Sequence, residues 1–374
     1  EDALRPIGGW RQRQSVDING VARSIISWED NSNNRRIAAG TYNKLYSISS
    51  GGVVTDITPS GFTGGAVSAG ANTGYGGSLF GRELYGEPRV DAGQITDATV
   101  WSLDNWGEYL LAMSPADGKL YEWQLNNAAD AVVVTNAPTG CSGFMVTEER
   151  FVACFGAGGI GRKVQWSDQE NNTVWTAAET NQAGDIELQT NGVILAGVRT
   201  RGQSLILTTE DAHTMTYQGP PFVFGFERVG TSCGLVGAKA AVSIDAGVIW
   251  MGRRSFFTYS GGGVQDLPCE VADYVFSDMN QDQRSKISAV VNSEWNEIWW
   301  FYPSSNSLEC DRYVAYDYAE GIWTTGLINR TAGMDRGVFR YPMFIASDGK
   351  LYEHEVGYNY DSVLPYAETG PFAI

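Results

Sequence analysis

The sequence predicts an all-β fold built from repeated four-stranded sheets, and three observations support this prediction. Aromatic residues make up 12% of the 374 residues and glycine contributes 45 of them, which is typical of many short strands joined by tight turns. One six-residue string occurs twice, and aromatic residues recur at a nearly regular interval. Together these features predict a single β-propeller of six or seven four-stranded blades.

The repeated string is Asp-Gly-Lys-Leu-Tyr-Glu, found at 117–122 and at 348–353, with a weaker copy at 43–46. In each copy a turn precedes a strand that begins Leu-Tyr. Aromatic residues at the same place in other segments complete a set of seven: Tyr46, Tyr121, Trp166, Tyr217, Tyr259, Tyr316 and Tyr352. Apart from a longer first interval, their spacing is roughly the 40–50 residues of a propeller blade. Each is expected in the third strand of its blade. We count seven sets, with six as the alternative.

The domain organisation follows from these sets. We expect an N-terminal arm and closing strand over 1–21, the propeller over 22–356 and a C-terminal tail over 357–374. A long Gly/Tyr-rich insertion follows the first blade at 60–99, and helical spacing of apolar residues predicts a short helical linker at 268–286. The last set is one strand short. The segment 10–16 can supply that strand and thereby remove both open sheet edges.

Composition excludes several classes of protein. The net charge of −17, from 26 basic and 43 acidic residues, argues against wrapping nucleic acid, because affinity for phosphate comes largely from Lys and Arg. No apolar run approaches the roughly 20 residues that cross a bilayer, so no membrane anchor is expected. The five cysteines show no CxxC spacing and are expected to be reduced core thiols: Cys141, Cys154, Cys233, Cys269 and Cys310.

The chain offers little for catalysis, and no catalytic, metal or cofactor-binding residue is predicted. His354 lies between two glutamates. In a strand, successive side chains point to opposite faces, so both glutamates would point away from His354. A surface strand is therefore expected there, and not a metal or acid/base site. His213 follows Glu210-Asp211 in a predicted hairpin turn and has no nearby ligand partner. The glycine-rich string at 156–161 matches Gly-x-Gly-x-x-Gly, but a strand continues after it, so a hairpin loop is predicted instead of a dinucleotide site.

One motif leaves hydrolase activity as an alternative function. The string Ser-Asp-Gln-Glu-Asn-Asn-Thr-Val-Trp at 167–175 resembles the Asp-box turn of sialidases, although the turn glycine is missing and no second copy is evident. A pair of carboxylates suffices for acidic glycoside hydrolysis, and among 43 acidic residues such a pair is uninformative without geometry. A glycoside hydrolase is therefore the less favoured alternative, and a non-enzymatic role is expected.

Five strings resemble virion structural proteins of tailed bacteriophages, in particular the propeller-containing tail hub or nozzle. They are Asp-Ala-Leu-Arg-Pro at 2–6, Trp-Ser-Leu-Asp-Asn-Trp-Gly at 101–107, Gly-Arg-Lys-Val-Gln-Trp-Ser-Asp at 161–168, Gly-Pro-Pro-Phe-Val-Phe-Gly-Phe at 219–226 and Asn-Glu-Ile-Trp-Trp-Phe-Tyr-Pro at 296–303. The resemblance implies a homo-oligomeric ring, expected to be a hexamer, in the virion tail after assembly in the host cytoplasm. Its neighbours would be portal or adaptor and tail fibre or tip proteins, and genomic DNA would pass without specific binding.

Subunit contacts are expected from the two arms. In the insertion, Tyr75, Phe80 and Tyr85 are candidate contact residues, and Trp10 is the candidate in the N-terminal arm, since aromatic side chains anchor interfaces better than charges do. A plain disordered insertion is the alternative for 60–99. For the whole chain, the alternative function is a propeller module that binds a host-surface glycan or receptor.

Overall fold

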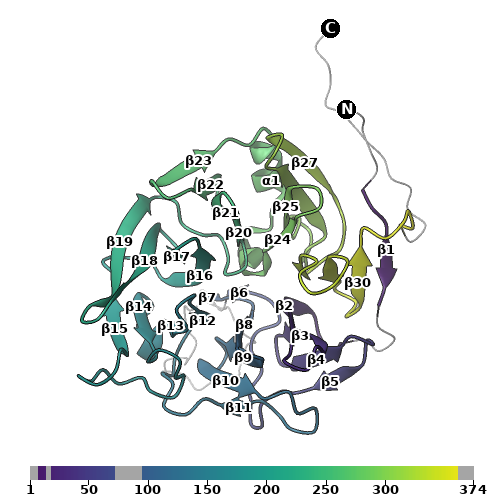
Figure 1. Cartoon of the computed structure of the whole chain (residues 1–374). Coiled ribbons are helices and arrows are strands. Elements are labelled where there is room, and N and C mark those ends of the chain that lie inside the picture. Colours follow the sequence, from purple (N-terminus) through teal and green to yellow (C-terminus); the bar gives the residue numbers. More distant parts are fainter. Residues whose placement is uncertain (1–6, 14–17, 72–94, 361–374) are drawn as a thin grey trace, which may run out of the picture.

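Seven four-stranded antiparallel sheets form a ring in the computed structural model, which describes residues 7–13, 18–71 and 95–360 (Figure 1). Six of these blades use strands that follow one another along the chain. Blade 1 consists of β2 (Ala22–Glu29), β3 (Arg35–Thr41), β4 (Leu45–Ser49) and β5 (Val54–Asp56), blade 2 of β8 (Ser102–Trp106), β9 (Tyr109–Ser114), β10 (Lys119–Trp123) and β11 (Val132–Val133), and blade 3 of β12 (Gly143–Val146), β13 (Val152–Phe155), β14 (Lys163–Trp166) and β15 (Gly184–Glu187). Blade 4 consists of β16 (Ile194–Thr200), β17 (Gln203–Thr208), β18 (Asp211–Gly219) and β19 (Val223–Thr231), blade 5 of β20 (Ala241–Ile244), β21 (Gly247–Met251), β22 (Phe256–Tyr259) and β23 (Val264–Leu267), and blade 6 of β24 (Ser288–Asn292), β25 (Glu297–Tyr302), β26 (Arg312–Asp317) and β27 (Ile322–Leu327). Blade 7 combines β28 (Ala332–Met334), β29 (Met343–Ile345) and β30 (Leu351–His354) with β1 (Trp10–Gln12). The fold is a seven-bladed β-propeller. Of the two predicted blade counts, six and seven, the structure confirms seven.

The aromatic anchors mark equivalent places in the blades. All seven lie in third strands counted from the centre, from Tyr46 in β4 to Tyr352 in β30. The duplicated string forms the same turn twice, with Gly118 at φ 64° and Gly349 at φ 78°, where a side chain would be strained. In both copies the tyrosine hydroxyl donates to the aspartate that opens the turn. The repeat therefore records a common hairpin.

Neighbouring blades pack face to face, so the second strands are buried on both sides. Residues 298–302 of β25 are all buried, as is typical of a continuous apolar run in a strand that is covered on both faces. Indoles fill the spaces between blades and satisfy backbone groups there. Trp101 donates from Nε1 to the Thr41 carbonyl of blade 1 (2.6 Å), and Trp300 donates to the carbonyl of Ala240, just before blade 5 (3.0 Å). These contacts combine apolar burial with an obligatory hydrogen bond.

Blade 7 is closed by the N-terminal segment, as the sequence predicts. Strand β1 pairs antiparallel with β30, and Trp10 stands opposite His354. The carboxylate of Glu353 in β30 is buried and accepts from Arg11 Nη2 (2.5 Å) and from Arg13. The first and last parts of the chain are therefore joined by backbone pairing and by ion pairs.

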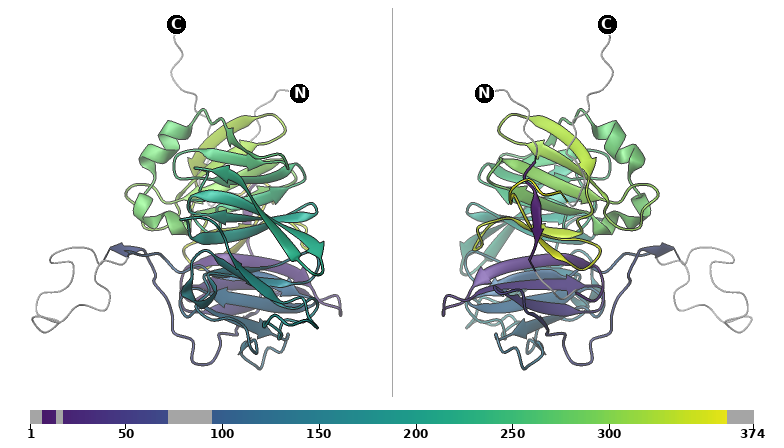
Figure 2. Two further views of the ribbon diagram at one scale, coloured as in Figure 1. Left: turned by 90° about the vertical axis from the view of Figure 1, so that its left-hand side faces the viewer. Right: turned by 90° about the vertical axis from the view of Figure 1, so that its right-hand side faces the viewer.

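Two longer connections lie on one face of the propeller (Figure 2). The insertion holds a short pair, β6 (Gly70–Ala71) with β7 (Ile95–Thr96). The linker before blade 6 holds α1 (Ala272–Asp278) and the 3₁₀ helix η2 (Gln281–Lys286), which agrees with the expected helical linker. Both lead from the outer strand of one blade to the inner strand of the next, and such connections share a face because every blade has the same strand order.

The remaining details agree with the composition. A further 3₁₀ turn, η1 (Ala157–Gly159), lies between β13 and β14. All five cysteines are free, four of them buried and Cys269 half-buried, so four of the five occupy the core positions that were expected. Along the ranges that the structure describes, no helix is long and apolar enough to span a bilayer.

We expect Glu353→Ala to lower the free energy of unfolding by about 2–3 kcal/mol, because Arg13 loses a buried carboxylate partner and β1 loses its side-chain attachment. Glu320→Ala removes an exposed carboxylate and should change stability by no more than about 0.5 kcal/mol. Chemical denaturation of the three proteins gives the comparison. Equal effects of the two substitutions would contradict a closing role for Glu353.

Candidate functional site

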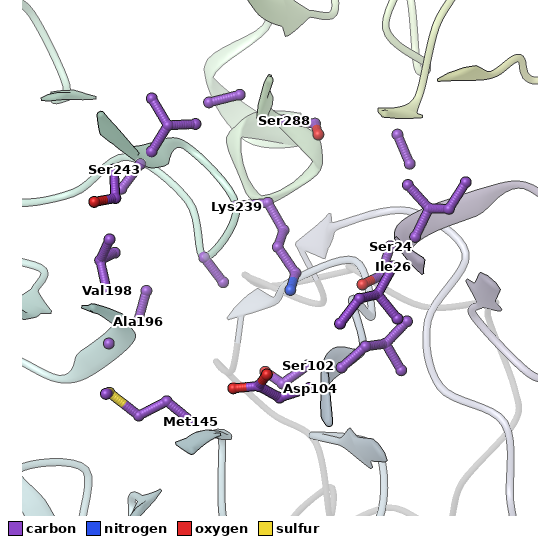
Figure 3. Close-up of a pocket in the computed structure, with 18 of the residues that line it drawn as sticks. Ser24, Ile26, Ser102, Asp104, Met145, Ala196, Val198, Lys239, Ser243 and Ser288 are labelled. Carbon is purple, nitrogen blue, oxygen red and sulfur yellow. The ribbon is translucent and has the colours of Figure 1, made fainter. Parts of the chain in front are cut away.

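The inner strands enclose a central cavity of about 380 Å³. Half of its lining residues are serine, alanine or glycine, and four charged residues stand among them: Arg23, Asp104, Arg199 and Lys239. Figure 3 shows Ser24, Ser102, Ser243 and Ser288 around the same space. A cavity of this volume fits a small ligand, and its charged groups are the places where binding can be specific.

Asp104 joins three blades. It lies on β8 of blade 2 and accepts from the backbone N–H of Val146 in blade 3 (2.9 Å) and from Arg199 Nη2 in blade 4 (3.0 Å). Its Oδ1 also accepts from the N–H of Asn105 (2.9 Å). Because each carboxylate oxygen is engaged, Asp104 holds neighbouring inner strands in register and Arg199 supplies its counter-charge.

Lys239 lies just before β20, and its side chain extends into the middle of the cavity, toward Asp104 (Figure 3). Its carbonyl accepts from the N–H of Ala289 (2.7 Å), which holds the backbone against blade 6. No hydrogen bond or ion pair joins its Nζ to any residue of 7–13, 18–71 or 95–360. Burial lowers the pKa of Lys239 to about 8, although the charge of Asp104 opposes this shift. The cavity therefore contains an ammonium group that lacks a direct partner among the described residues.

One end of the cavity is covered by the insertion stem, which we define as residues 65–71 and 95–99. Arg23, 2% exposed, donates from Nη2 to the carbonyl of Val67 (2.5 Å) and to Glu309 Oε1 (2.7 Å). Lys286 donates from Nζ to the same Glu309 oxygen (2.8 Å) and to Ser68 Oγ (3.0 Å). Two buried cations thus share one carboxylate and hold the stem against blades 1 and 6.

Amide and hydroxyl groups of η2 complete this attachment. Gln283 accepts from the N–H of Ala69 (3.0 Å) and donates from Nε2 to the Ala69 carbonyl (2.9 Å). On the returning side of the stem, the N–H of Ala98 donates to Ser285 Oγ (3.1 Å). The stem consequently runs from blade 1 to the linker before blade 6, and both of its sides are held there.

The opposite end of the cavity opens into a hollow of about 810 Å³. The two spaces share wall residues, among them Arg199, Val242 and Gly333. Turns between first and second strands contribute to the rim and carry Arg201 and Asp245, which form an exposed ion pair (3.5 Å). A ligand can therefore reach the cavity from the face opposite the insertion stem.

The predicted subunit-contact residues fall in two groups. Tyr75, Phe80 and Tyr85 lie outside the described residues. Trp10 is half-buried and packs within the chain, stacked on His354 with 5.5 Å between ring centroids and edge-on to Tyr360 at 5.5 Å. A role for these residues between subunits stays a prediction.

The prediction of a surface position for His354 is wrong. The side chain is 4% exposed, and its Nε2 accepts from Arg330 Nε (2.8 Å). Burial and the Arg330 charge hold the pKa of His354 well below its ordinary value. The reason for the error is that Trp10 of the closing strand covers the imidazole, a contact that alternation within β30 could not reveal.

The other motifs prove to be local structure. His213 is buried inside strand β18, so its predicted position in a hairpin turn is wrong. The string at 156–161 forms the turn between β13 and β14, as predicted. The string at 167–175 lies in the connection from β14 to β15, where Asp168 Oδ1 accepts from the N–H of Gln182 (2.8 Å). Within the described ranges, no group of three or more His, Cys, Asp or Glu residues is placed to hold a metal ion.

Comparison with known proteins gives the fold. No protein-family model and no curated protein matches the chain. Among solved structures, it is similar to virginiamycin B lyase from Staphylococcus aureus (TM-score 0.55, 8% identity, 92% of this chain and 98% of that chain). It is also similar to a streptogramin B lyase (0.50, 11%, 92% and 96%) and to the WD40 β-propeller domain of Doa1 (0.51, 9%, 92% and 97%). At such identities the likeness shows a β-propeller and carries no activity to this chain.

Sequence reasoning missed the cavity charges. The available signal was the placement of Arg23 and Asp104 on the first strands of their blades, among small and apolar residues. Lys239 stands between two alanines just before another first strand. First strands line the axis of a propeller, so a charged residue there faces the centre or a neighbouring blade.

We expect Lys239→Met to raise the free energy of unfolding by about 1 kcal/mol at pH 7, because it removes an unpartnered charge from the cavity. The unfolded lysine keeps its proton up to about pH 10.4, whereas the folded pKa is about 8. Wild-type stability should therefore rise between about pH 8 and 10, and the advantage of the variant should shrink at pH 9.5.

Denaturant unfolding at pH 7 and 9.5 measures this difference. Lys119→Met, which removes an exposed lysine in β10, is the matched control and should show the same small effect at both values. An advantage of Lys239→Met that is independent of pH would contradict the assignment.

We further expect Glu309→Gln to release the insertion stem, because Arg23 and Lys286 would both lose their buried counter-charge, at a cost of about 3 kcal/mol. Hydrogen exchange of the backbone amides at 65–69 and 98 should accelerate at least tenfold. Glu179→Gln, at an exposed position, should leave these amides unchanged. Unaltered protection in Glu309→Gln would show that η2 alone holds the stem.

Proposed function

We propose that this propeller is a non-enzymatic structural subunit of a bacteriophage tail, in which copies form a hub- or nozzle-like ring, expected to be a hexamer, and dock neighbouring tail proteins. The observation that carries the proposal is the firm attachment of the insertion stem to one propeller face. The five strings that resemble phage virion proteins give the class of assembly. The attachment of the stem is a feature of the structure and the resemblance is a feature of the sequence, so neither depends on the other.

The stem makes the insertion a suitable docking element. Burying Arg23 and Lys286 is costly without good partners, so a cluster of this kind fixes where the stem lies. Between the paired strands β6 and β7 the chain carries 72–94, whose sequence includes Tyr75, Phe80 and Tyr85. A segment rich in aromatic residues, held at its base, favours contact with a neighbouring subunit.

The DNA path in this proposal runs through the ring of copies and not through one propeller. The cavity of each propeller measures about 380 Å³ and is covered at one end by the stem, so it admits a small molecule and not a duplex. The net charge of −17 supports a conduit that DNA passes without adhering, because acidic surfaces repel phosphates.

The test replaces 72–94 with a short Gly-Asn-Gly connection and leaves the stem intact. We expect the variant to keep the wild-type melting temperature but to remain a monomer in native mass spectrometry, whereas the wild type forms closed rings. A deletion beginning at Gly64 is unsuitable, because it would remove Val67, Ser68 and Ala69, which bond to the propeller.

A triple variant, Tyr75→Ser, Phe80→Ser and Tyr85→Ser, keeps the length of the insertion and should assemble as poorly as the replacement. Rings of normal size from both variants would remove the insertion from the proposal. A wild-type chain that stays monomeric and binds a glycan would replace the tail ring with a receptor-binding module.

A further inference from the structure

The covered end of the central cavity holds an excess of positive charge. Arg23 and Lys286 share the single carboxylate of Glu309 there, and Lys239 adds a third cation. Asp104 also attracts the Lys239 charge, but Arg199 is its ion-pair partner, so the Asp104–Arg199 pair adds no net charge. The charges in and beside the cavity therefore sum to plus two, inside a chain whose net charge is −17.

Two cations at this end have donors without a partner among the described residues. Lys239 is half-buried, and its Nζ makes no hydrogen bond with the part of the chain that the structure describes. Arg23 Nε and Nη1 are buried without a hydrogen bond, and an unmade hydrogen bond to a buried charged group is costly. The free Lys239 Nζ, beside the under-compensated charge of Arg23 in the same wall, indicates a ligand that accepts hydrogen bonds and carries negative charge.

The topology places these donors at the same end of the cavity. Arg23 is the second residue of β2, and Lys239 lies two residues before β20. The inner strands of all blades run in the same direction along the axis, so both cations stand at the end beneath the insertion stem. The hydroxyls of Ser24 and Ser288 border the same space (Figure 3) and can complete the coordination of an anion.

We infer that the covered end of the cavity binds a small dianionic oxyanion, with Lys239 as the charged ligand, Arg23 as a neighbouring positive charge, and Ser24 and Ser288 as hydroxyl ligands. The cavity of about 380 Å³ accommodates inorganic phosphate or a short dicarboxylate, which share this chemistry. The ligand enters from the hollow on the opposite face. Binding belongs to the single propeller, so it does not depend on ring assembly or on the proposed tail function.

The experiment titrates the full chain with inorganic phosphate and, separately, with malonate, in isothermal calorimetry at constant ionic strength and pH 7.5. Wild-type protein and Lys119→Met should bind at least one of the two anions with one site per chain. Lys239→Met should weaken that binding at least about tenfold, as expected on loss of one charge-assisted hydrogen bond. Lys239→Arg should retain it.

A pH series adds an independent readout. Malonate remains a dianion from pH 7 to 9.5, and among the charged residues that line the cavity Arg23 and Arg199 stay cationic while Asp104 stays ion-paired with Arg199. Loss of the Lys239 proton should therefore weaken binding progressively above about pH 8, and this trend should be absent in Lys239→Arg. If only phosphate binds, the difference in phosphate affinity between Lys239→Met and Lys119→Met tests whether Lys239 is a ligand.

Two results would overturn the inference. One is the absence of saturable binding of either anion to wild-type protein up to about 10 mM. The other is equal affinity of Lys239→Met and Lys119→Met, which would place any bound anion elsewhere on the chain. Neither result bears on ring formation, which native mass spectrometry of the insertion variants measures separately.

Discussion

Closure of the ring is the constraint on which the rest of this structure depends. Each blade is packed on both faces by its neighbours, so blade 7 must be complete before blades 1 and 6 have their full contacts. Its outer strand, β1, comes from the other end of the chain, and Glu353 pairs with the two arginines that flank Gln12. Joining the ends in this way removes an open sheet edge and couples the folding stability of the first blade to that of the last.

The same closure creates the central cavity, and electrostatics then decides its character. Asp104 links three inner strands through neutral and charged donors, so its charge is satisfied. At the covered end the balance is reversed, because Glu309 serves both Arg23 and Lys286. One cluster therefore has two consequences. It fixes the base of the insertion on the propeller face, and it leaves positive charge that favours an anion in the cavity.

The limits of prediction have a physical reason in the blade itself. The aromatic anchors were found because hairpins repeat local geometry, and local geometry is encoded by neighbouring residues. His354 was misplaced because alternation distinguishes a buried from an exposed face only when one face meets solvent. In a propeller both faces of a sheet meet other blades, and Trp10 covers the imidazole from a strand at the far end of the chain. The cavity charges escaped detection for the same reason.

What the sequence by itself determined is the local and repetitive part of this protein. The twin Asp-Gly-Lys-Leu-Tyr-Glu turns, the seven third strands and the buried run in β25 follow from residues a few positions apart, and the acidic composition limits nucleic-acid binding. Only the tertiary structure decided which strands face the axis and which charges meet. Arg23 and Glu309 lie on blades 1 and 6. No short-range sequence pattern predicts that these two side chains are in contact, because only closure of the whole ring brings them together.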